Sequence, residues 1–146
     1  MLINDLIINK SDVEVMNTLG MTVMAKFVNS KGIPFTKHFK NFDDFNEFKE
    51  QCEDVGTTLS SHVWVGYVIR KKHTNGNSYI LVKGGWVANM PDKFICVEDT
   101  YSTRRIAKMV ASRYKKDDVS YDKLDLACKG STYDVVTVVN GKITTF

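Results

Sequence analysis

Three short turn signals, each between runs of alternating apolar and polar residues, constrain this chain more than any other feature. They are Ser30-Lys31-Gly32, Asn75-Gly76 and Asn140-Gly141. Tight turns that end in glycine join antiparallel neighbours, whereas parallel strands need a long crossover connection. The sequence therefore predicts an antiparallel sheet built from hairpins rather than from strand–helix–strand units.

The first and last of these turns each predict one hairpin. The first lies within residues 23–39 and places Phe27 opposite Phe35 on one face. The last joins strands predicted over residues 133–139 and 142–146. Both hairpins follow from the alternation of side chains that a half-buried strand requires.

The middle turn predicts a longer hairpin and therefore fixes which residues share a face. Read as a two-residue turn, Asn75-Gly76 places Arg70 opposite Leu81. The same register predicts two further pairs, Lys72 with Tyr79 and Val65 with Trp86. One face then collects the core residues, and the other is mixed, aromatic and basic. Gly84 and Gly85 are predicted to mark a bulge or close backbone packing, and residues 93–98 to form a third strand.

Helical spacing marks the segment after the first hairpin. Apolar residues recur there every three or four positions between Asn41, a good N-cap, and Gly56. They are Phe42, Phe45, Phe48, Cys52 and Val55. A shorter helix before the first hairpin is predicted from Ser11 with Glu14, a capping-box pattern, up to Gly20.

A second main helix is predicted over residues 102–116, capped by Thr100 or Ser102. Its apolar side would carry Ile106, Ala107 and Val110. Residues 120–128 are predicted as a further short helix. The order of hairpin, helix, meander, helix and hairpin predicts an α+β fold, one domain over residues 1–146, with two main helices packed on the sheet.

Composition limits the class of protein. The chain has 146 residues, 43% of them apolar and 25% charged, which is ordinary for a globular domain. No run approaches the roughly 20 apolar residues of a membrane span, and the N-terminus does not resemble a secretory leader. The 3 cysteines, Cys52, Cys96 and Cys128, are far apart. We therefore expect reduced thiols, a cytoplasmic protein without membrane association, and no cofactor.

Charge is segregated along the chain. Residues 1–54 carry a net charge of −3, residues 55–116 a net charge of +8, and residues 117–146 a net charge of −2. No acidic residue occurs between positions 100 and 116. Segregated charge of this kind attracts partners of opposite sign or neutralises another surface of the same fold.

The basic middle segment supplies the candidate binding site. Its cations could neutralise phosphates, and exposed aromatic rings could stack on bases. The predicted ligand-binding residues are Arg70, Lys72, Lys83, Arg104, Arg105, Lys108, Trp64 and Tyr79. The leading hypothesis is a non-enzymatic protein that binds nucleic acid or a nucleotide-like ligand. The alternative for the two aromatic residues is that a helix covers this sheet face and that both belong to a core.

A second hypothesis is a small inhibitor or adaptor that binds another protein, since exposed aromatic residues also suit protein interfaces. The chain has 16 Lys, 4 Arg and 10 Asn, a bias typical of AT-rich coding. This favours a phage-encoded antagonist of a host protein, which would act in the host cytoplasm.

A third hypothesis is a metal-dependent nuclease. Gly66-Tyr67-Val68, followed after Asn75-Gly76 by Tyr79-Ile80, resembles the hairpin of GIY-YIG nucleases. That resemblance implies paired tyrosines, an arginine on the next helix and a metal-binding glutamate. It covers the hairpin alone, and Val68 and Leu81 depart from the family pattern. Asp92 and Glu98 similarly resemble the acids of PD-(D/E)xK nucleases, with Thr100 in place of the lysine. The spacing of the 3 histidines predicts no zinc site.

Overall fold

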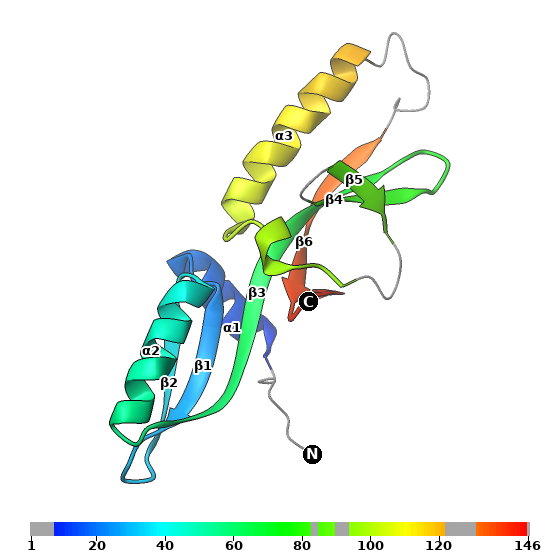
Figure 1. The fold of residues 1–146 in the computed structure, drawn as a ribbon. Coiled ribbons are helices and arrows are strands. Elements are labelled where there is room, and N and C mark those ends of the chain that lie inside the picture. The colour runs from blue at the N-terminus through cyan, green and yellow to red at the C-terminus, as the bar shows by residue number, and fades with distance from the viewer. Residues whose placement is uncertain (1–7, 83–84, 90–93, 122–130, 146) are drawn as a thin grey trace. The chain divides into compact units, whose positions relative to one another are not determined.

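The computed structural model describes residues 8–82, 85–89, 94–121 and 131–145 (Figure 1). The chain divides into two compact units, which we call the first unit (up to Val65) and the second unit (Gly66–Thr145). The predicted α+β fold with an antiparallel sheet is confirmed, since every strand pair with a described register is antiparallel. The prediction of one domain stays a prediction.

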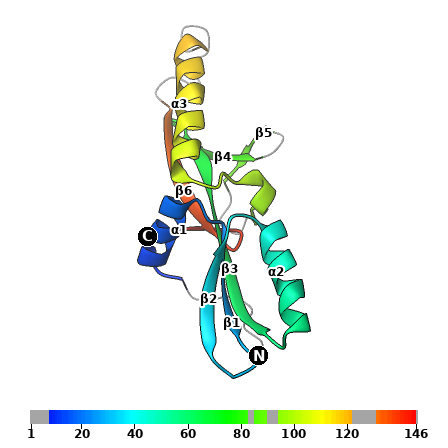
Figure 2. The ribbon, with the colours of Figure 1, turned by 90° about the vertical axis from the view of Figure 1, so that its left-hand side faces the viewer.

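The first unit contains two helices and a three-stranded sheet. Its elements are α1 (Lys10–Leu19), β1 (Val23–Val28), β2 (Pro34–Phe39), α2 (Phe42–Asp54) and the first half of β3 (Thr58–Lys72). The strand order is β2-β1-β3, so β1 is central and β2 lies at the edge. Figure 2 shows α1 and α2 on opposite sides of this sheet.

The first helix forms as predicted, but its cap differs. The Asn9 side chain accepts a hydrogen bond of 2.9 Å from the Asp12 amide, and the Asp12 carboxylate accepts one from the Asn9 amide. Asn9 therefore replaces Ser11 as the N-cap, and the helix begins at Lys10. The helix ends as predicted at Gly20, whose φ of 69° lies in the left-handed region.

A phenylalanine cluster joins α2 to the first hairpin. The predicted pairing of Phe27 with Phe35 is confirmed, and their rings stack with centroids 5.5 Å apart. The predicted Asn41 cap is also confirmed, because its side chain accepts from the Asp44 amide at 2.8 Å. Phe48 from α2 contacts Phe27 edge-on at 5.1 Å. The helical period of α2 and the alternation of β1 therefore meet in one core.

The second unit contains the rest of the sheet and one long helix. Its elements are the second half of β3, β4 (Ser78–Val82), β5 (Gly85–Ala88), a short 3-10 helix (Val97–Asp99), α3 (Arg104–Tyr121), β6 (Thr132–Val139) and β7 (Lys142–Thr144). The strand order is β5-β4-β3-β6-β7. The predicted final hairpin is confirmed, with Asn140 at φ 49° and Gly141 at φ 87° in its turn.

The predicted register of the middle hairpin is wrong by one residue. Arg70 pairs with Ile80, not Leu81, and Lys72 pairs with Ser78, not Tyr79. The reason is the length of the loop, since His73 N donates to Asn77 O at 2.8 Å and thereby closes a three-residue loop around Asn75-Gly76. A one-residue shift changes which side chains of the two strands share a face.

The strand after this hairpin is also shorter than predicted. Val82 pairs with Gly85, so β5 runs back along β4, and Trp86 faces Leu81 rather than Val65. Gly85, predicted to mark a bulge, has φ 125° and begins this new strand. The third strand predicted over residues 93–98 is wrong, because residues 94–96 are irregular and the 3-10 helix follows.

The second main helix is confirmed with a different cap. The Thr103 hydroxyl, rather than Thr100 or Ser102, accepts from the Ile106 amide at 3.2 Å, whereas the Thr100 hydroxyl donates to Val97 O. Of the short helix predicted over 120–128, residues 120–121 extend α3, and 122–130 lie outside the described residues. No helix in the described part of the chain is long and apolar enough to cross a membrane.

Candidate anion-binding surface

Helix α3 covers one face of the second unit's sheet. Ala111 of the helix packs with Ile69 of β3 and Leu81 of β4, and Trp86 and Tyr114 complete this layer. Because side chains alternate along a strand, Arg70 and Lys72 must point to the opposite face from Ile69. Arg70 and Lys72 therefore do not lie on one surface with the helix cations of the candidate site.

Arg70 is already matched with a carboxylate of the protein. Its Nε donates to Asp134 Oδ1 at 3.1 Å, and its Nη2 donates to the other carboxylate oxygen. This hydrogen bonding raises the pKa of Arg70 above its ordinary value. The pair lies on the sheet face away from α3, beside exposed Lys72. Arg70 therefore acts first as a cross-strand link between β3 and β6.

The two aromatic candidates are held by the protein's own side chains. Trp64 belongs to the first unit and is only 8% exposed. It pairs with Val23 on the face where the His62 ring packs on Phe45 of α2, so the alternative of a covered face holds for Trp64. Tyr79 is half-buried and contacts the His73 ring edge-on at 5.1 Å. Lys83 lies outside the described residues.

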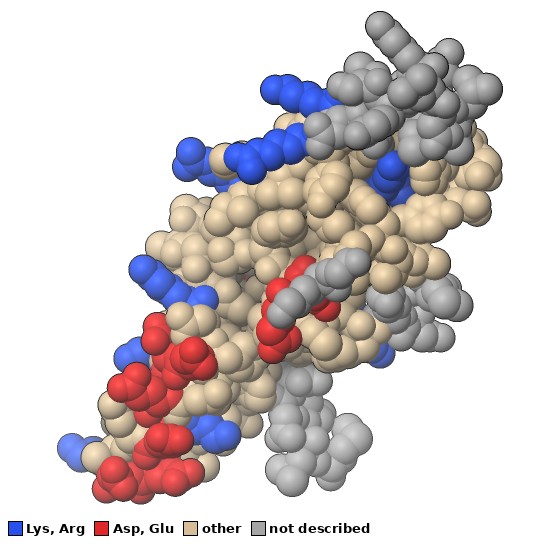
Figure 3. Space-filling model, turned by 45° about the horizontal axis from the view of Figure 1, so that its top comes forward, with Lys and Arg blue, Asp and Glu red and all other residues tan. Residues whose placement is uncertain are grey.

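Three of the predicted residues come together in the first turns of α3. Arg104 is half-buried, with its guanidinium 5.4 Å from the Tyr67 ring centroid. Arg105 and Lys108 are exposed, and so are three further cations along the helix, Arg113, Lys115 and Lys116. We call Arg105, Lys108, Arg113, Lys115 and Lys116 the cationic face of α3. Figure 3 shows Lys and Arg side chains projecting over this part of the molecule.

The placement of Arg104 and Arg105 works against helix stability. Both lie in the first turn of α3, where the unpaired amide groups make the helix end positive, and that turn holds no acidic residue. A cation at this end costs roughly 0.3 to 1 kcal/mol. Residues that oppose local stability in this way are expected where they serve a function.

Lys71 was missed by the sequence reasoning. It is only 7% exposed, with Nζ 5.7 Å from the Trp86 ring centroid and 5.4 Å from that of Tyr133. The ammonium thus lies over two aromatic faces, which stabilise a cation. The only signal in the sequence was that Lys71 lies two positions after Ile69 and so on the same face of the strand. The predicted register placed no aromatic residue opposite Lys71.

Glu98, the described acidic residue of the nuclease hypothesis, lies beside a separate cavity of about 360 Å³ in the second unit. Glu98 and Asp99 line it together with Tyr101 and Tyr114. Burial and the neighbouring Tyr114 raise the pKa of Tyr101. No group of three or more potential metal ligands occurs among the described residues, and Asp92 lies outside them. The described part of this cavity therefore offers two carboxylates rather than a metal centre.

Comparison of the chain with models of protein families, with curated proteins and with solved structures found no match in any of the three.

Proposed function

We propose that this chain is a non-enzymatic binding protein whose second unit binds the phosphate backbone of nucleic acid through the cationic face of α3. The observation that supports this is the one-sided chemistry of the helix. Its packed side carries Ala107 and Ala111, whereas every charged residue of positions 104–116 is basic. Asp117 and Asp118 follow this basic stretch within α3. Exposed cations release counterions when they meet phosphates.

Backbone binding of this kind has a defined salt dependence. If four to five cations contact phosphates, the logarithm of the affinity should fall against the logarithm of the salt concentration with a slope of about −3 to −4.5. Base sequence should matter little, because contacts to phosphates carry no sequence information.

The test is fluorescence anisotropy with labelled single-stranded and duplex oligonucleotides of several sequences. The double variant Lys108→Glu/Lys115→Glu should weaken all of them alike and flatten the salt slope by about 2. The matched control is Lys26→Glu/Lys31→Glu, which makes the same charge change at exposed lysines of the first unit. If no oligonucleotide binds at low salt, or if both double variants lose affinity equally, the proposal is wrong.

The second candidate function is a protein-binding inhibitor or adaptor. Such a protein would be a phage-encoded antagonist that acts on a host protein in the host cytoplasm. The observation that favours it is the exposure of two large apolar residues on α3, Ile106 at 43% and Met109 at 52%. Apolar side chains of this size suit a protein partner better than a phosphate backbone. Replacing both by serine should abolish protein capture from host extract and leave oligonucleotide binding unchanged.

A further inference from the structure

The edge of the first unit's sheet is open for another strand. Among the described strands, β2 has β1 as its neighbour on one side and none on the other. Asn29 N donates to Ile33 O at 3.0 Å and Thr22 N to Phe39 O at 2.8 Å, so the odd-numbered residues of β2 turn their backbone groups toward β1. By the alternation of an antiparallel ladder, Thr36 and His38 turn theirs outward.

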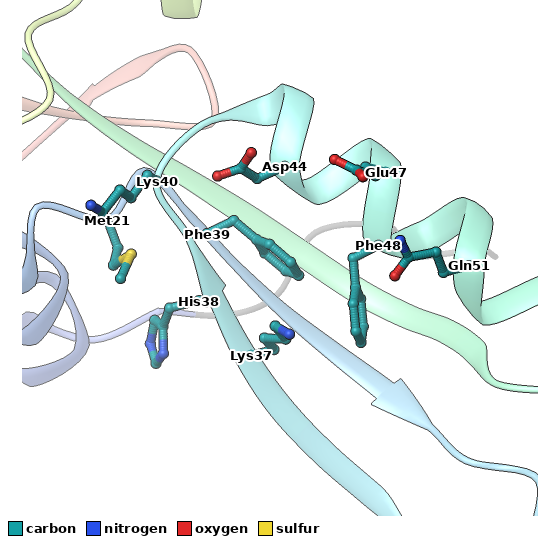
Figure 4. Close-up of a pocket in the computed structure, with 9 residues that line it drawn as sticks. All are labelled: Met21, Lys37, His38, Phe39, Lys40, Asp44, Glu47, Phe48 and Gln51. Atoms are coloured by element: carbon teal, nitrogen blue, oxygen red, sulfur yellow. The ribbon is translucent and has the colours of Figure 1, made fainter.

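A groove runs along this open edge. It has a volume of about 540 Å³ and is lined by consecutive residues of β2 and by one side of α2. Consecutive strand residues point to opposite faces, so a groove that contacts Lys37, His38 and Phe39 together must follow the edge itself. Figure 4 shows the Phe39 and Phe48 rings between β2 and α2, and His38 turned away from the helix.

The two walls of the groove differ in chemistry. The centroids of the Phe39 and Phe48 rings lie 5.5 Å apart, and Lys37 Nζ lies 4.1 Å from the centroid of Phe48. The α2 wall presents Asp44 and Glu47, whereas the strand side of the lining carries Lys37 and Lys40. The whole helix carries six acidic residues against Lys49, and Figure 3 shows the acidic side chains gathered on the surface. An apolar floor thus lies between an acidic wall on α2 and the lysines on the strand side.

We propose that the β2–α2 groove binds an extended basic peptide of another protein, which adds as a strand to β2. The peptide backbone would pair with the outward groups of Thr36 and His38, as in other cases of strand addition. On the side facing α2, an apolar side chain would contact Phe48, and a Lys or Arg two positions away would face Asp44 and Glu47. This inference concerns the first unit and is independent of the function proposed for α3.

The charge of α2 argues against a second copy of this chain as the occupant. Pairing β2 with β2 of another copy in an antiparallel sheet places the two α2 helices on the same face. Each helix carries a net charge of −5 from its own side chains, so the two would repel. A Lys or Arg of a peptide, placed on the side that faces α2, instead meets the opposite charge.

The test is selection of a displayed library of random heptapeptides against the full chain and against His38→Pro. Proline removes the outward N–H and is tolerated at such an edge position, because that N–H makes no bond within the sheet. His38→Thr is the matched control, since it keeps the N–H. We expect enrichment of an apolar residue and a basic residue two positions apart, with affinity at least about tenfold weaker for His38→Pro and unchanged for His38→Thr.

Two further measurements keep the proposal testable if His38→Pro fails to fold. N-methylation along an enriched peptide should abolish binding at every second residue, and Glu47→Lys should weaken binding about tenfold more than Glu53→Lys, which lies outside the groove lining. The proposal is overturned if no peptide is enriched, if N-methylation shows no period of two, or if the free edge instead forms a dimer in sedimentation experiments.

Discussion

The two hairpins on either side of α2 show how differently similar turn signals behave. In the first unit the predicted pairing of Phe27 with Phe35 is correct, and the phenylalanine core follows from it. In the second unit the predicted pairing of Arg70 is wrong by one residue. Tyr79 therefore pairs with Lys71 and does not share a face with Arg70 and Lys72. The comparison teaches that the period of a strand is robust, whereas its register depends on a single residue of loop length.

The largest expected loss of stability tests the correctly predicted hairpin of the first unit. Phe27 is fully buried and contacts three other rings, so Phe27→Ala should cost about 3 to 5 kcal/mol of unfolding free energy. Denaturant titration measures the loss. Val55→Ala is the control, because Val55 is 65% exposed and should change stability by less than about 0.5 kcal/mol. A loss below about 1 kcal/mol for Phe27→Ala would contradict the phenylalanine core.

The next effect tests the corrected register through two adjacent lysines. Lys71 lies buried over two rings, whereas Lys72 is exposed on the opposite face. Lys71→Glu should therefore cost about 2 to 3 kcal/mol, because the aromatic faces and burial both disfavour an anion. Lys72→Glu should cost less than about 0.5 kcal/mol. Equal losses in thermal denaturation would mean that Lys71 is not enclosed as described.

A smaller effect tests the link between β3 and β6. A double-mutant cycle on Arg70→Ala and Asp134→Ala should give a coupling free energy of about 0.5 to 1 kcal/mol, since the side chains are 26% and 48% exposed. The coupling should shrink in high salt. The same cycle with Lys72→Ala in place of Arg70→Ala should give a coupling free energy near zero. If the two cycles gave equal coupling, the assignment of Arg70 as the partner of Asp134 would be wrong.

The smallest effect separates stability from binding. Arg105→Glu places an acidic residue in the first turn of α3 and should stabilise the protein by about 0.3 to 1 kcal/mol. The same variant should weaken oligonucleotide binding. Lys115→Glu should weaken binding without the gain in stability, because it lies away from both helix ends. If Arg105→Glu left the affinity unchanged, Arg105 would have no part in the proposed surface.

Much of the candidate site could not be read from the sequence, for reasons visible in particular residues. Trp64 alternates like an exposed strand residue, but α2 packs on its face of the sheet. Arg70 counts as a free cation until Asp134, 64 positions away, is found beside it. The cations of α3 were easier to assign, because the helical period alone places Arg105 and Lys108 on the side away from Ala107.

The sequence by itself determined the antiparallel α+β class, the first and last hairpins, the positions of the three α-helices and the basic side of α3. These follow from local periods of two and 3.6 residues and from turn chemistry. Only the tertiary structure decided the register of the middle hairpin, the pairing of Arg70, the enclosure of Lys71 and the open edge of β2. Each of these depends on contacts between residues far apart in the sequence. A local pattern does not determine the free energy of such contacts.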